Sequence, residues 1–311
     1  MYIPELAYPP EEDEHVFREA QLQLGIISMH VEAVTMAGSA AKKNQDAFGF
    51  NIGPNRFLAG VFDGAVSRIA SHEAKKLFEG HPEAIPAYQM LSHVNAGLAN
   101  VELNGGASTG TLIEVALDDE TPEEISDEAS AWWFDIAHVS DSWAMLLMRD
   151  KNTRLLTRDQ HEHHDRKVLK KMARIAVEEG ISLAEARHDP RVVQALTDMF
   201  TLRRNAPDRR GGEGILNGSR HMDQYIQTLL KRINIADVER ILIGTDGARF
   251  PRKHERDSRY RRNFFTIVKN HGVETVLDQI RRSEELRPPT PEHPRWSVHD
   301  DKTLIDIALD I

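Results

Sequence analysis

Residues 58–66 read LAGVFDGAV, an apolar run that favours a buried strand and that ends on Asp63 and Gly64. The pattern returns at 240–248, where RILIGTDGA leads a second apolar run into Asp246 and Gly247. A charged carboxylate beside a buried strand costs free energy unless something satisfies it. A single Asp-Gly pair is explained by a helix cap or a turn, because glycine allows positive φ there. The repetition favours a shared role for the two strand ends.

Further acids lie at other expected strand ends. Asp46 begins a strand after KKNQ, Asp141 lies between two strands in HVSDSWAM, and Asp300 precedes the last strand. Aspartates gathered at one edge of a sheet sandwich make a dense negative cluster, which folds comfortably only around cations. All-oxygen ligands suit Mg²⁺ or Mn²⁺. Two such ions, roughly 3.5–4 Å apart, bridge one water, lower its pKa and direct it at a phosphorus atom.

Strand-like and helix-like segments come in groups along the chain. Apolar patterns bounded by turn residues predict strands at 24–30, 46–53, 55–63, 109–117, 131–140, 142–149, 240–247 and 302–311. Helical spacing predicts helices at 68–79, 86–102, 165–178, 182–188, 190–200, 257–270 and 272–285. Several strands follow one another too closely for crossover helices, which indicates antiparallel pairing. We therefore expect an α+β fold in which two sheets pack together with helices on their outer faces.

The composition excludes several classes of protein. The 311 residues contain 39 Lys and Arg against 49 Asp and Glu, so the net charge is −10 and no overall basic field would hold nucleic acid. There is no cysteine, which excludes disulfides and Cys-ligated metal centres. No stretch has the roughly 20 apolar residues that span a membrane, and the N-terminus lacks signal-peptide order. We expect one domain over 1–311, in the cytoplasm, with no membrane or nucleic-acid partner.

Two other motifs invite a function that their spacing does not support. The stretch HEHHD (161–165) has Asp165 where the zinc-protease motif His-Glu-x-x-His needs its second histidine. The glycine-rich stretch NGGASTG (104–110) lacks the Lys-Ser/Thr that ends a phosphate-binding P-loop. We interpret the first as the solvated, histidine-rich start of the flap, and the second is not a P-loop.

Seven short motifs, taken in order, resemble those of a known family. They are NQDAFGF (44–50), VFDGAVS (61–67), GASTGTL (106–112), HVSDSWAML (138–146), LLTRDQH (155–161), ILIGTDGARF (241–250) and DDKTL (300–304). From about residue 24 to the C-terminus, the chain resembles the PPM, or type 2C, metal-dependent Ser/Thr protein phosphatases, as a bacterial-type member. The resemblance implies an αββα sandwich of two antiparallel sheets flanked by helices, with a dinuclear metal centre at one end of the sheets. Residues 1–23 would form an N-terminal extension, and 158–214 a flap beside the active site.

The resemblance also implies roles for particular residues. The two Mn²⁺ or Mg²⁺ ions would be held by Asp46, Asp63, Asp246 and Asp300, with the Gly64 carbonyl as an additional ligand. Asp141 would bind a third, weaker ion. The implied reaction is direct attack of a metal-bridging hydroxide on phosphoserine or phosphothreonine, and no general acid is identified. The implied partners are a phosphorylated protein substrate and a cognate Ser/Thr kinase.

The sequence departs from the family pattern next to this site. Ala41 replaces the phosphate-binding arginine of many members, so Lys42 and Lys43 are the candidate phosphate-binding residues, acting as point charges rather than as a bidentate fork. Ala65 stands where some members have a proposed general-acid histidine, and Ser140 opens a hairpin that begins with glycine in the family. These changes keep two alternatives open. One is a non-catalytic module that binds phosphoproteins or senses a partner, and the other is a phosphatase for a small molecule or nucleotide.

Overall fold

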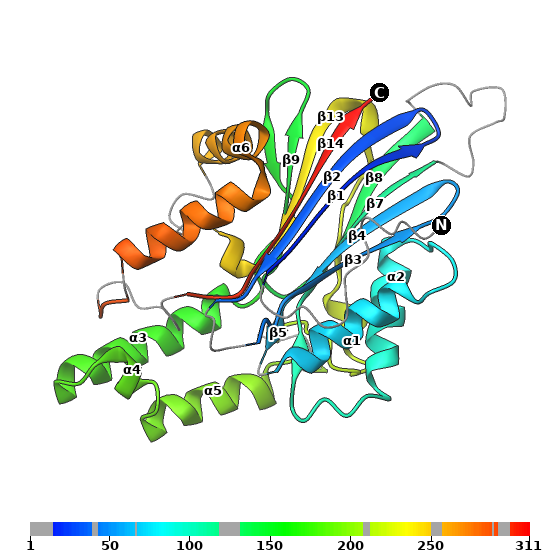
Figure 1. Ribbon diagram of the computed structural model, residues 1–311. Coiled ribbons are helices and arrows are strands. Elements are labelled where there is room, and N and C mark those ends of the chain that lie inside the picture. Colours follow the sequence, from blue (N-terminus) through cyan, green and yellow to red (C-terminus); the bar gives the residue numbers. More distant parts are fainter. Residues whose placement is uncertain are drawn as a thin grey trace.

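Two antiparallel β-sheets packed face to face form the centre of the molecule, as the computed structural model shows (Figure 1). The structure describes residues 15–38, 43–65, 67–117, 131–207, 212–249, 257–287, 289–291 and 299–311. The first sheet consists, in spatial order, of His15–Leu24 (β1), Ile27–Met36 (β2), Lys302–Asp310 (β14), Val238–Gly244 (β13), Trp143–Met148 (β9) and Thr153–Leu155 (β10). The second consists of Gln227–Thr228 (β11), Trp132–Val139 (β8), Gly110–Leu117 (β7), Arg56–Phe62 (β4) and Ala47–Ile52 (β3), and Ile233–Asn234 (β12) also pairs with β8.

The main hydrophobic core lies between the two sheets. Val31 and Ile243 from the first sheet pack in one buried cluster with Val61 and Phe134 from the second. All four side chains are fully shielded from solvent, and burying an aliphatic or aromatic side chain of this size stabilises the fold by about 1.5–3 kcal/mol. The strands read as nearly continuous apolar runs because helices cover the outer faces of the sheets as well.

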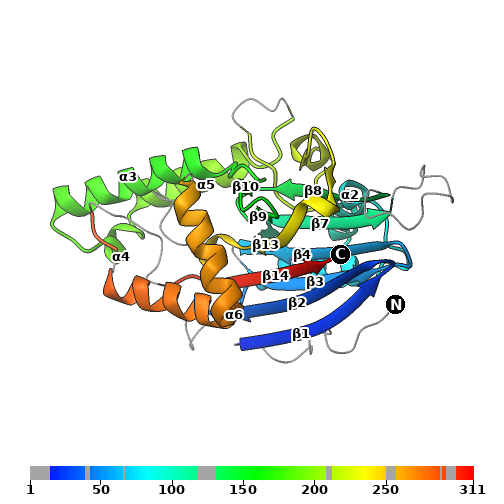
Figure 2. The ribbon, with the colours of Figure 1, turned by 90° about the horizontal axis from the view of Figure 1, so that it is seen from above.

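Helices cover both outer faces, which completes the expected αββα sandwich and confirms the fold class (Figures 1 and 2). Arg68–Glu79 (α1) and Ala87–Leu98 (α2) pack on the second sheet, where Phe78 and Leu91 join a buried cluster with Leu112. Ser258–Leu286 (α6) packs on the first sheet. It comprises two helices joined at Gly272, whose φ of 77° is not helical. The break falls where the sequence predicts that one helix ends and the next begins.

The predicted N-terminal extension over 1–23 is wrong from residue 15 onward. Residues of β1 pair with β2 along their whole length, from His15 opposite Met36 to Leu24 opposite Ile27. Val16, Leu22 and Leu24 point into the core, while the residues between them are largely exposed. This alternation is typical of an edge strand with one buried face. Residues 1–14 lie outside the described part of the chain.

Three helices in the predicted flap region form a separate lobe, seen at the lower left of Figure 1. They are Glu162–Glu179 (α3), Leu183–Ala186 (α4) and Pro190–Leu202 (α5). This flap lobe has its own small core, in which Met172, Ile175 and Val192 are buried. A capping box at Ser182 starts α4, and the Asp189 side chain caps α5 by accepting from Arg191 N–H.

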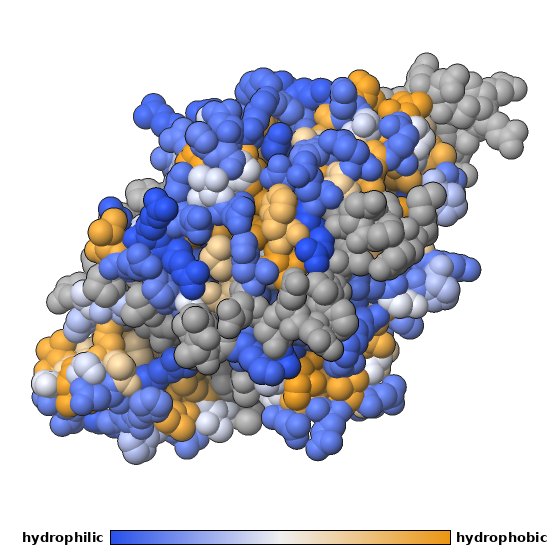
Figure 3. Space-filling view, in the orientation of Figure 1, coloured by the Kyte–Doolittle hydropathy of each residue, from blue (hydrophilic) through white to orange (hydrophobic). Residues whose placement is uncertain are grey.

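The face of the molecule shown in Figure 3 is mostly hydrophilic, and apolar side chains show on the flap lobe at its lower left. Among the large apolar side chains that the structure describes as exposed, Val177, Val193 and Leu202 belong to this lobe. Within the described ranges, no helix has both the length and the apolar character required to cross a membrane.

The antiparallel pairing brings the aspartate-bearing strand ends to one end of the sandwich. Ala47, which begins β3, lies opposite Phe62 at the end of β4, and Gly110 at the start of β7 lies opposite Val139 at the end of β8. In the other sheet, Gly244 at the end of β13 lies opposite both Trp143 and Leu304. The loops that carry the candidate acids therefore all leave the same end of the two sheets.

Candidate metal centre

Asp63 is held at the end of β4 by the start of β7. The Asp63 backbone N–H donates to Thr109 Oγ1 at 3.3 Å, and the Thr109 N–H donates back to the Asp63 carbonyl at 2.9 Å. Thr109 Oγ1 also lies 2.5 Å from Ser142 Oγ, in the loop that carries Asp141. This threonine therefore links two of the acid-bearing loops, which follow β4 and β8, the two strands that flank β7.

Gly64 is required by a close approach of backbone. Its N–H donates to the Gln45 carbonyl at 3.1 Å, and a Cβ at this position would lie 2.6 Å from that same oxygen and 2.9 Å from the Ser67 carbonyl. Ser71 Oγ donates to the Gln45 carbonyl as well. The loop before β3 and the loop after β4 are thus packed too closely for any side chain. The chain's own atoms are sufficient to explain the glycine, whether or not ions lie beside it.

Thr245 joins the end of β13 to Asp46 and to β14. Its hydroxyl donates to Asp46 Oδ2 at 2.6 Å and accepts from the Thr303 N–H at 2.9 Å. The Thr245 N–H in turn donates to the Thr303 carbonyl at 3.0 Å. Thr245, Thr303 and Asp46 are all buried, and Asp246 follows directly as the next residue, partly exposed. The hydroxyl therefore fixes two candidate ligands relative to each other.

Asp300 and Asp301 have different surroundings although they are neighbours. Asp301 accepts from two backbone donors, Gly38 N–H at 2.5 Å and Gln45 N–H at 2.8 Å, and so ties the end of the β2 segment to the start of the β3 segment. Asp300 is exposed, its Oδ1 accepts from the Asp301 N–H at 3.1 Å, and its carbonyl accepts from the buried Lys302 ammonium at 2.7 Å. The arrangement leaves Asp301 as a structural acid and Asp300 as the one able to meet a ligand.

Electrostatic repulsion shows that the candidate acids share one region. Burial raises the pKa of Asp63 well above its usual range, and repulsion from Asp46, Asp246, Asp141 and Asp300 raises it further. The pKa of Asp46 is also raised, first by burial and then mainly by the Asp301 charge, although its hydrogen bond from Thr245 acts in the opposite direction. Both shifts mean that ionising these acids is costly without a counter-charge.

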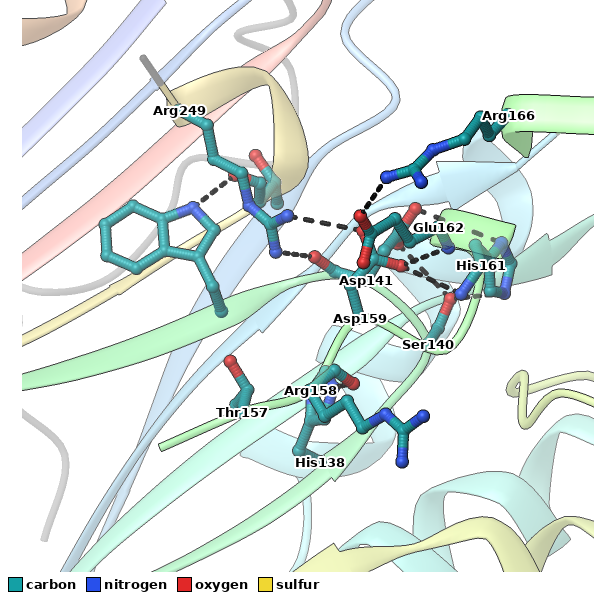
Figure 4. Close-up of polar contacts among 12 residues, drawn as sticks. His138, Ser140, Asp141, Thr157, Arg158, Asp159, His161, Glu162, Arg166 and Arg249 are labelled. Atoms are coloured by element: carbon teal, nitrogen blue, oxygen red, sulfur yellow. Dashed lines mark hydrogen bonds and ion pairs between the residues drawn. The ribbon is translucent and has the colours of Figure 1, made fainter. Parts of the chain in front are cut away.

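Asp141 lies in a buried polar cluster at the base of the flap lobe (Figure 4). Ser140 Oγ lies 2.8 Å from His161 Nε2 and 3.2 Å from Asp141 Oδ1. The Arg249 guanidinium donates to the Asp141 carbonyl and pairs with Asp159 at 3.4 Å. Ser140 has a φ of 81°, in the left-handed region that glycine adopts without strain. Its hydrogen bonds to His161 and Asp141 accompany this backbone conformation.

The chemistry of these residues fits a hard divalent cation, although their side chains do not already enclose one. The donors are all oxygens, and the repulsion that raises the pKa values of Asp46 and Asp63 is what a cation would relieve. In the part of the chain that the structure describes, no group of three or more His, Asp or Glu side chains is arranged to hold a metal ion. Metal binding would therefore require the carboxylates to draw together.

Of the two lysines predicted to bind phosphate, the structure describes only Lys43. Lys43 is exposed and lies three residues before Asp46, whereas Ala41 and Lys42 lie outside the described residues. The sequence reasoning did not identify Thr245, Arg249 or Asp301 as residues that build the site. Thr245 and Arg249 both lie in the ILIGTDGARF motif, which could have marked them as candidates. Their hydrogen-bond partners, however, are distant in the sequence.

Comparison with solved structures shows what the chain is similar to. A crystal structure of RsbX in complex with magnesium is 13% identical, with a TM-score of 0.50, and the match covers 95% of this chain and all of the other. The catalytic domain of the serine/threonine protein phosphatase PstP, in complex with two manganese ions, is 16% identical, with a TM-score of 0.51 and coverage of 92% and 100%. The PPM Ser-Thr phosphatase MsPP from Mycobacterium smegmatis, in complex with cacodylate, is 19% identical, with a TM-score of 0.46 and coverage of 90% and 98%.

No family model matches the sequence, and no curated protein matches it. At these identities the likeness concerns the arrangement of the chain in space, and it spans nearly the whole chain. The chain therefore has the fold of the PPM-type Ser/Thr phosphatases, as its motifs predict.

Proposed function

We propose that this protein is a metal-dependent phosphatase that hydrolyses phosphoserine and phosphothreonine in proteins. The observation that carries the proposal is the meeting of Asp46, Asp63, Asp141, Asp246 and Asp300 at one end of the sandwich, close enough to raise the pKa of Asp63 together. Such a concentration of acids on rigid strand ends is costly to fold unless it binds cations. The fold shared with the PstP catalytic domain supports the same assignment.

Asp46, Asp63, Asp246, Asp300 and the Gly64 carbonyl would hold two Mn²⁺ or Mg²⁺ ions, and Asp141 would bind a third. When bound, a pair of such ions supplies a hydroxide nucleophile and neutralises phosphoryl charge. The chain's own contribution is to position the ligands. Thr245 orients Asp46, Thr109 fixes the backbone of Asp63, and the close backbone packing at Gly64 keeps its loop from moving.

Lys43 and Lys42 would bind the substrate phosphate in place of the family's arginine. Lys43 is exposed and near Asp46 in the sequence, so its ammonium can reach a ligand at the same end of the sheets. A lysine binds phosphate as a point charge and gives less orientation than a bidentate arginine. A phosphorylated protein, its cognate kinase and a cytoplasmic location complete the proposal.

Metal-dependent turnover tests this proposal. Purified protein would be assayed with p-nitrophenyl phosphate and with a phosphothreonine peptide, in Mn²⁺, in Mg²⁺ and in EDTA. We expect hydrolysis with metal and none in EDTA. We also expect loss of activity in Asp246→Asn, which replaces a charged ligand carboxylate by a neutral amide. Asp198→Asn, on the exposed surface of α5, makes the same change in charge away from the site and should retain activity. Absence of turnover with either metal would contradict the proposal.

A second candidate function is a non-catalytic module that binds a phosphoprotein. The observation that favours it is the open arrangement of the acids, which form no ready-made metal site among the described residues. The replacement of the family's arginine by Ala41 points in the same direction. Saturable binding of the phosphothreonine peptide without any metal-dependent turnover would favour this function, whereas robust turnover would eliminate it.

A further inference from the structure

The sandwich is open along one side, where the edge strands of its two sheets face each other across a groove. β10 is an edge strand of the first sheet (Figure 2), while β11 and β12 pair with β8 and form an edge of the second. The groove between them has a volume of about 750 Å³ and is lined by residues 153–156, 228–231, 233 and 261. This docking groove, as we call it below, lies outside the acid cluster and shares no residue with it.

The outer edge of β10 presents backbone groups that the sheet does not use. The hydrogen bonds to β9 run through Asn152, whose carbonyl accepts from Met148 at 2.8 Å, and Leu156, whose N–H donates to Ala144 at 2.9 Å. Alternate residues along a strand turn their N–H and C=O groups to opposite sides. Thr153 and Leu155 therefore direct theirs outward, and within the described residues no strand pairs with that side. A partner strand can add there.

The lining combines apolar side chains with positive charge. Leu229 and Ile233 form part of the apolar wall, and Leu230 is fully exposed at the rim. Arg154 and Lys231 are exposed, line the same groove, and form no salt bridge within the described part of the chain. Among the described residues that line the groove none is acidic, although the whole chain carries a net charge of −10. The groove is thus a basic exception on an acidic protein.

The charges decide which occupant the groove favours. An edge strand that carries a cationic side chain repels strands that are themselves basic. Two copies of this chain that paired through β10 would bring Arg154 of one copy close to the same basic rim of the other, so self-association is disfavoured. An acidic strand meets the opposite situation, because its carboxylates would pair with Arg154 and Lys231 while its backbone bonds to Thr153 and Leu155. Alternating apolar side chains would contact the wall.

We infer that the docking groove binds an extended, acidic segment of a partner protein, which adds as a strand to β10. Next to the groove residues Leu156 and Thr228, the Arg158 N–H donates to Gln227 Oε1 at 3.2 Å and joins the segment after β10 to β11. Ala144, bonded to Leu156, is three residues from Asp141, so the two lie within about 11 Å of each other. A segment bound there would hold its protein beside the acid cluster. The inference does not depend on phosphatase activity, because binding requires neither metal nor turnover.

Peptide binding to the metal-free protein tests the inference. The probes would be the fluorescein-labelled peptide Glu-Leu-Glu-Val-Glu-Leu-Glu and a counterpart with Lys in place of every Glu, measured by fluorescence anisotropy. We expect the acidic peptide to bind at least about tenfold more tightly than the basic one, and its affinity to fall with added salt. Hydrogen exchange should show slower exchange at the Thr153 and Leu155 amides in the complex.

Three variants separate the contributions of charge and backbone. Arg154→Glu combined with Lys231→Glu should weaken binding of the acidic peptide at least about tenfold. Thr153→Pro removes an outward N–H without removing a bond to β9, and should also weaken binding at least about tenfold. Lys170→Glu, on the exposed face of α3, changes the charge away from the groove and should leave affinity within about twofold. Unfolding midpoints would establish that each variant is folded.

Several results would overturn the inference. Equal affinity for the two peptides, or no binding of either, would show that the groove does not select an acidic segment. Full binding by a folded Thr153→Pro variant, together with unchanged exchange of the Thr153 and Leu155 amides in the wild-type complex, would exclude strand addition. A dimer in light scattering that Thr153→Pro converts to a monomer would show that a second copy occupies the groove instead.

Discussion

Replacing Thr245 by valine removes one hydroxyl that makes two buried hydrogen bonds and keeps the side-chain shape almost unchanged. The hydroxyl donates to Asp46 Oδ2 at 2.6 Å and accepts from the Thr303 N–H at 2.9 Å, and all three residues are buried. A buried N–H left without a partner costs about 1–3 kcal/mol, and the lost bond to the carboxyl costs about 1–2 kcal/mol. Because these contributions do not add fully, we expect Thr245→Val to lower the free energy of unfolding by about 2–4 kcal/mol.

The pH dependence of this loss gives a second, independent readout. The Thr245 hydrogen bond lowers the pKa of Asp46, so its removal makes the ionised form of Asp46 still less favourable in the folded protein. The destabilisation should therefore be larger at pH 8 than at pH 5. Urea unfolding followed by circular dichroism, in EDTA, measures both quantities. Thr266→Val, on the exposed face of α6, is the matched control and should change stability by less than about 0.5 kcal/mol.

A loss below about 0.5 kcal/mol in Thr245→Val would refute this reasoning, because surface substitutions alone stay within that range. It would mean that the hydroxyl does not connect β13, β14 and the Asp46 loop as the structure shows. A loss of the expected size that does not change with pH would keep the packing argument and contradict the electrostatic one.

Three further changes have expected outcomes. Gly64→Ala places a Cβ 2.6 Å from the Gln45 carbonyl, so we expect unfolding to become easier by about 1–3 kcal/mol in urea titrations; an unchanged midpoint would contradict the close packing. Burial raises the pKa of Asp306 to about 7, with Arg240 opposing the shift, and a folded-state pKa above the unfolded one means that stability is lost as pH rises from about 4 to 7. The wild type should thus lose about 2–3 kcal/mol relative to Asp306→Asn between pH 5 and pH 8, and parallel curves would exclude this role. Arg249→Lys keeps the charge but not the two-pronged contact, so amide exchange in α3 should become faster, whereas unchanged exchange would show that Arg249 does not hold the flap lobe.

The sandwich was predictable from the sequence because its strands are apolar on both faces and its turns are short. The break at Gly272 was predictable for a related reason, since glycine after a run of helical spacing marks a helix end. The strand β1 was missed because it is an edge strand. Only alternate residues such as Val16 and Leu22 are buried, and the polar residues between them read as part of an acidic extension.

The sequence allowed the acids of the candidate site to be predicted, but not the hydrogen bonds that hold them in place. An apolar run that ends on Asp63 or Asp246 is visible in one segment of sequence, and the shared fold brings such segments together. The contacts that build the site join residues that are far apart along the chain, as when Asp301 accepts from Gln45 or Thr245 donates to Asp46. No local pattern specifies such pairs. Glycine is required at position 64 because the Gln45 carbonyl packs against it, and only the three-dimensional structure shows this contact.

Calorimetric titration of the metal-free protein with Mn²⁺ tests the central claim most directly, because it asks whether the converging acids bind cations at all. We expect saturable binding of about two ions, and we expect Asp63→Asn to abolish most of it, since Asp63 interacts with the four other candidate aspartates. Asp198→Asn, with the same loss of charge on α5, should bind Mn²⁺ like the wild type. Absence of saturable binding, or equal binding by wild type and Asp63→Asn, would contradict the account.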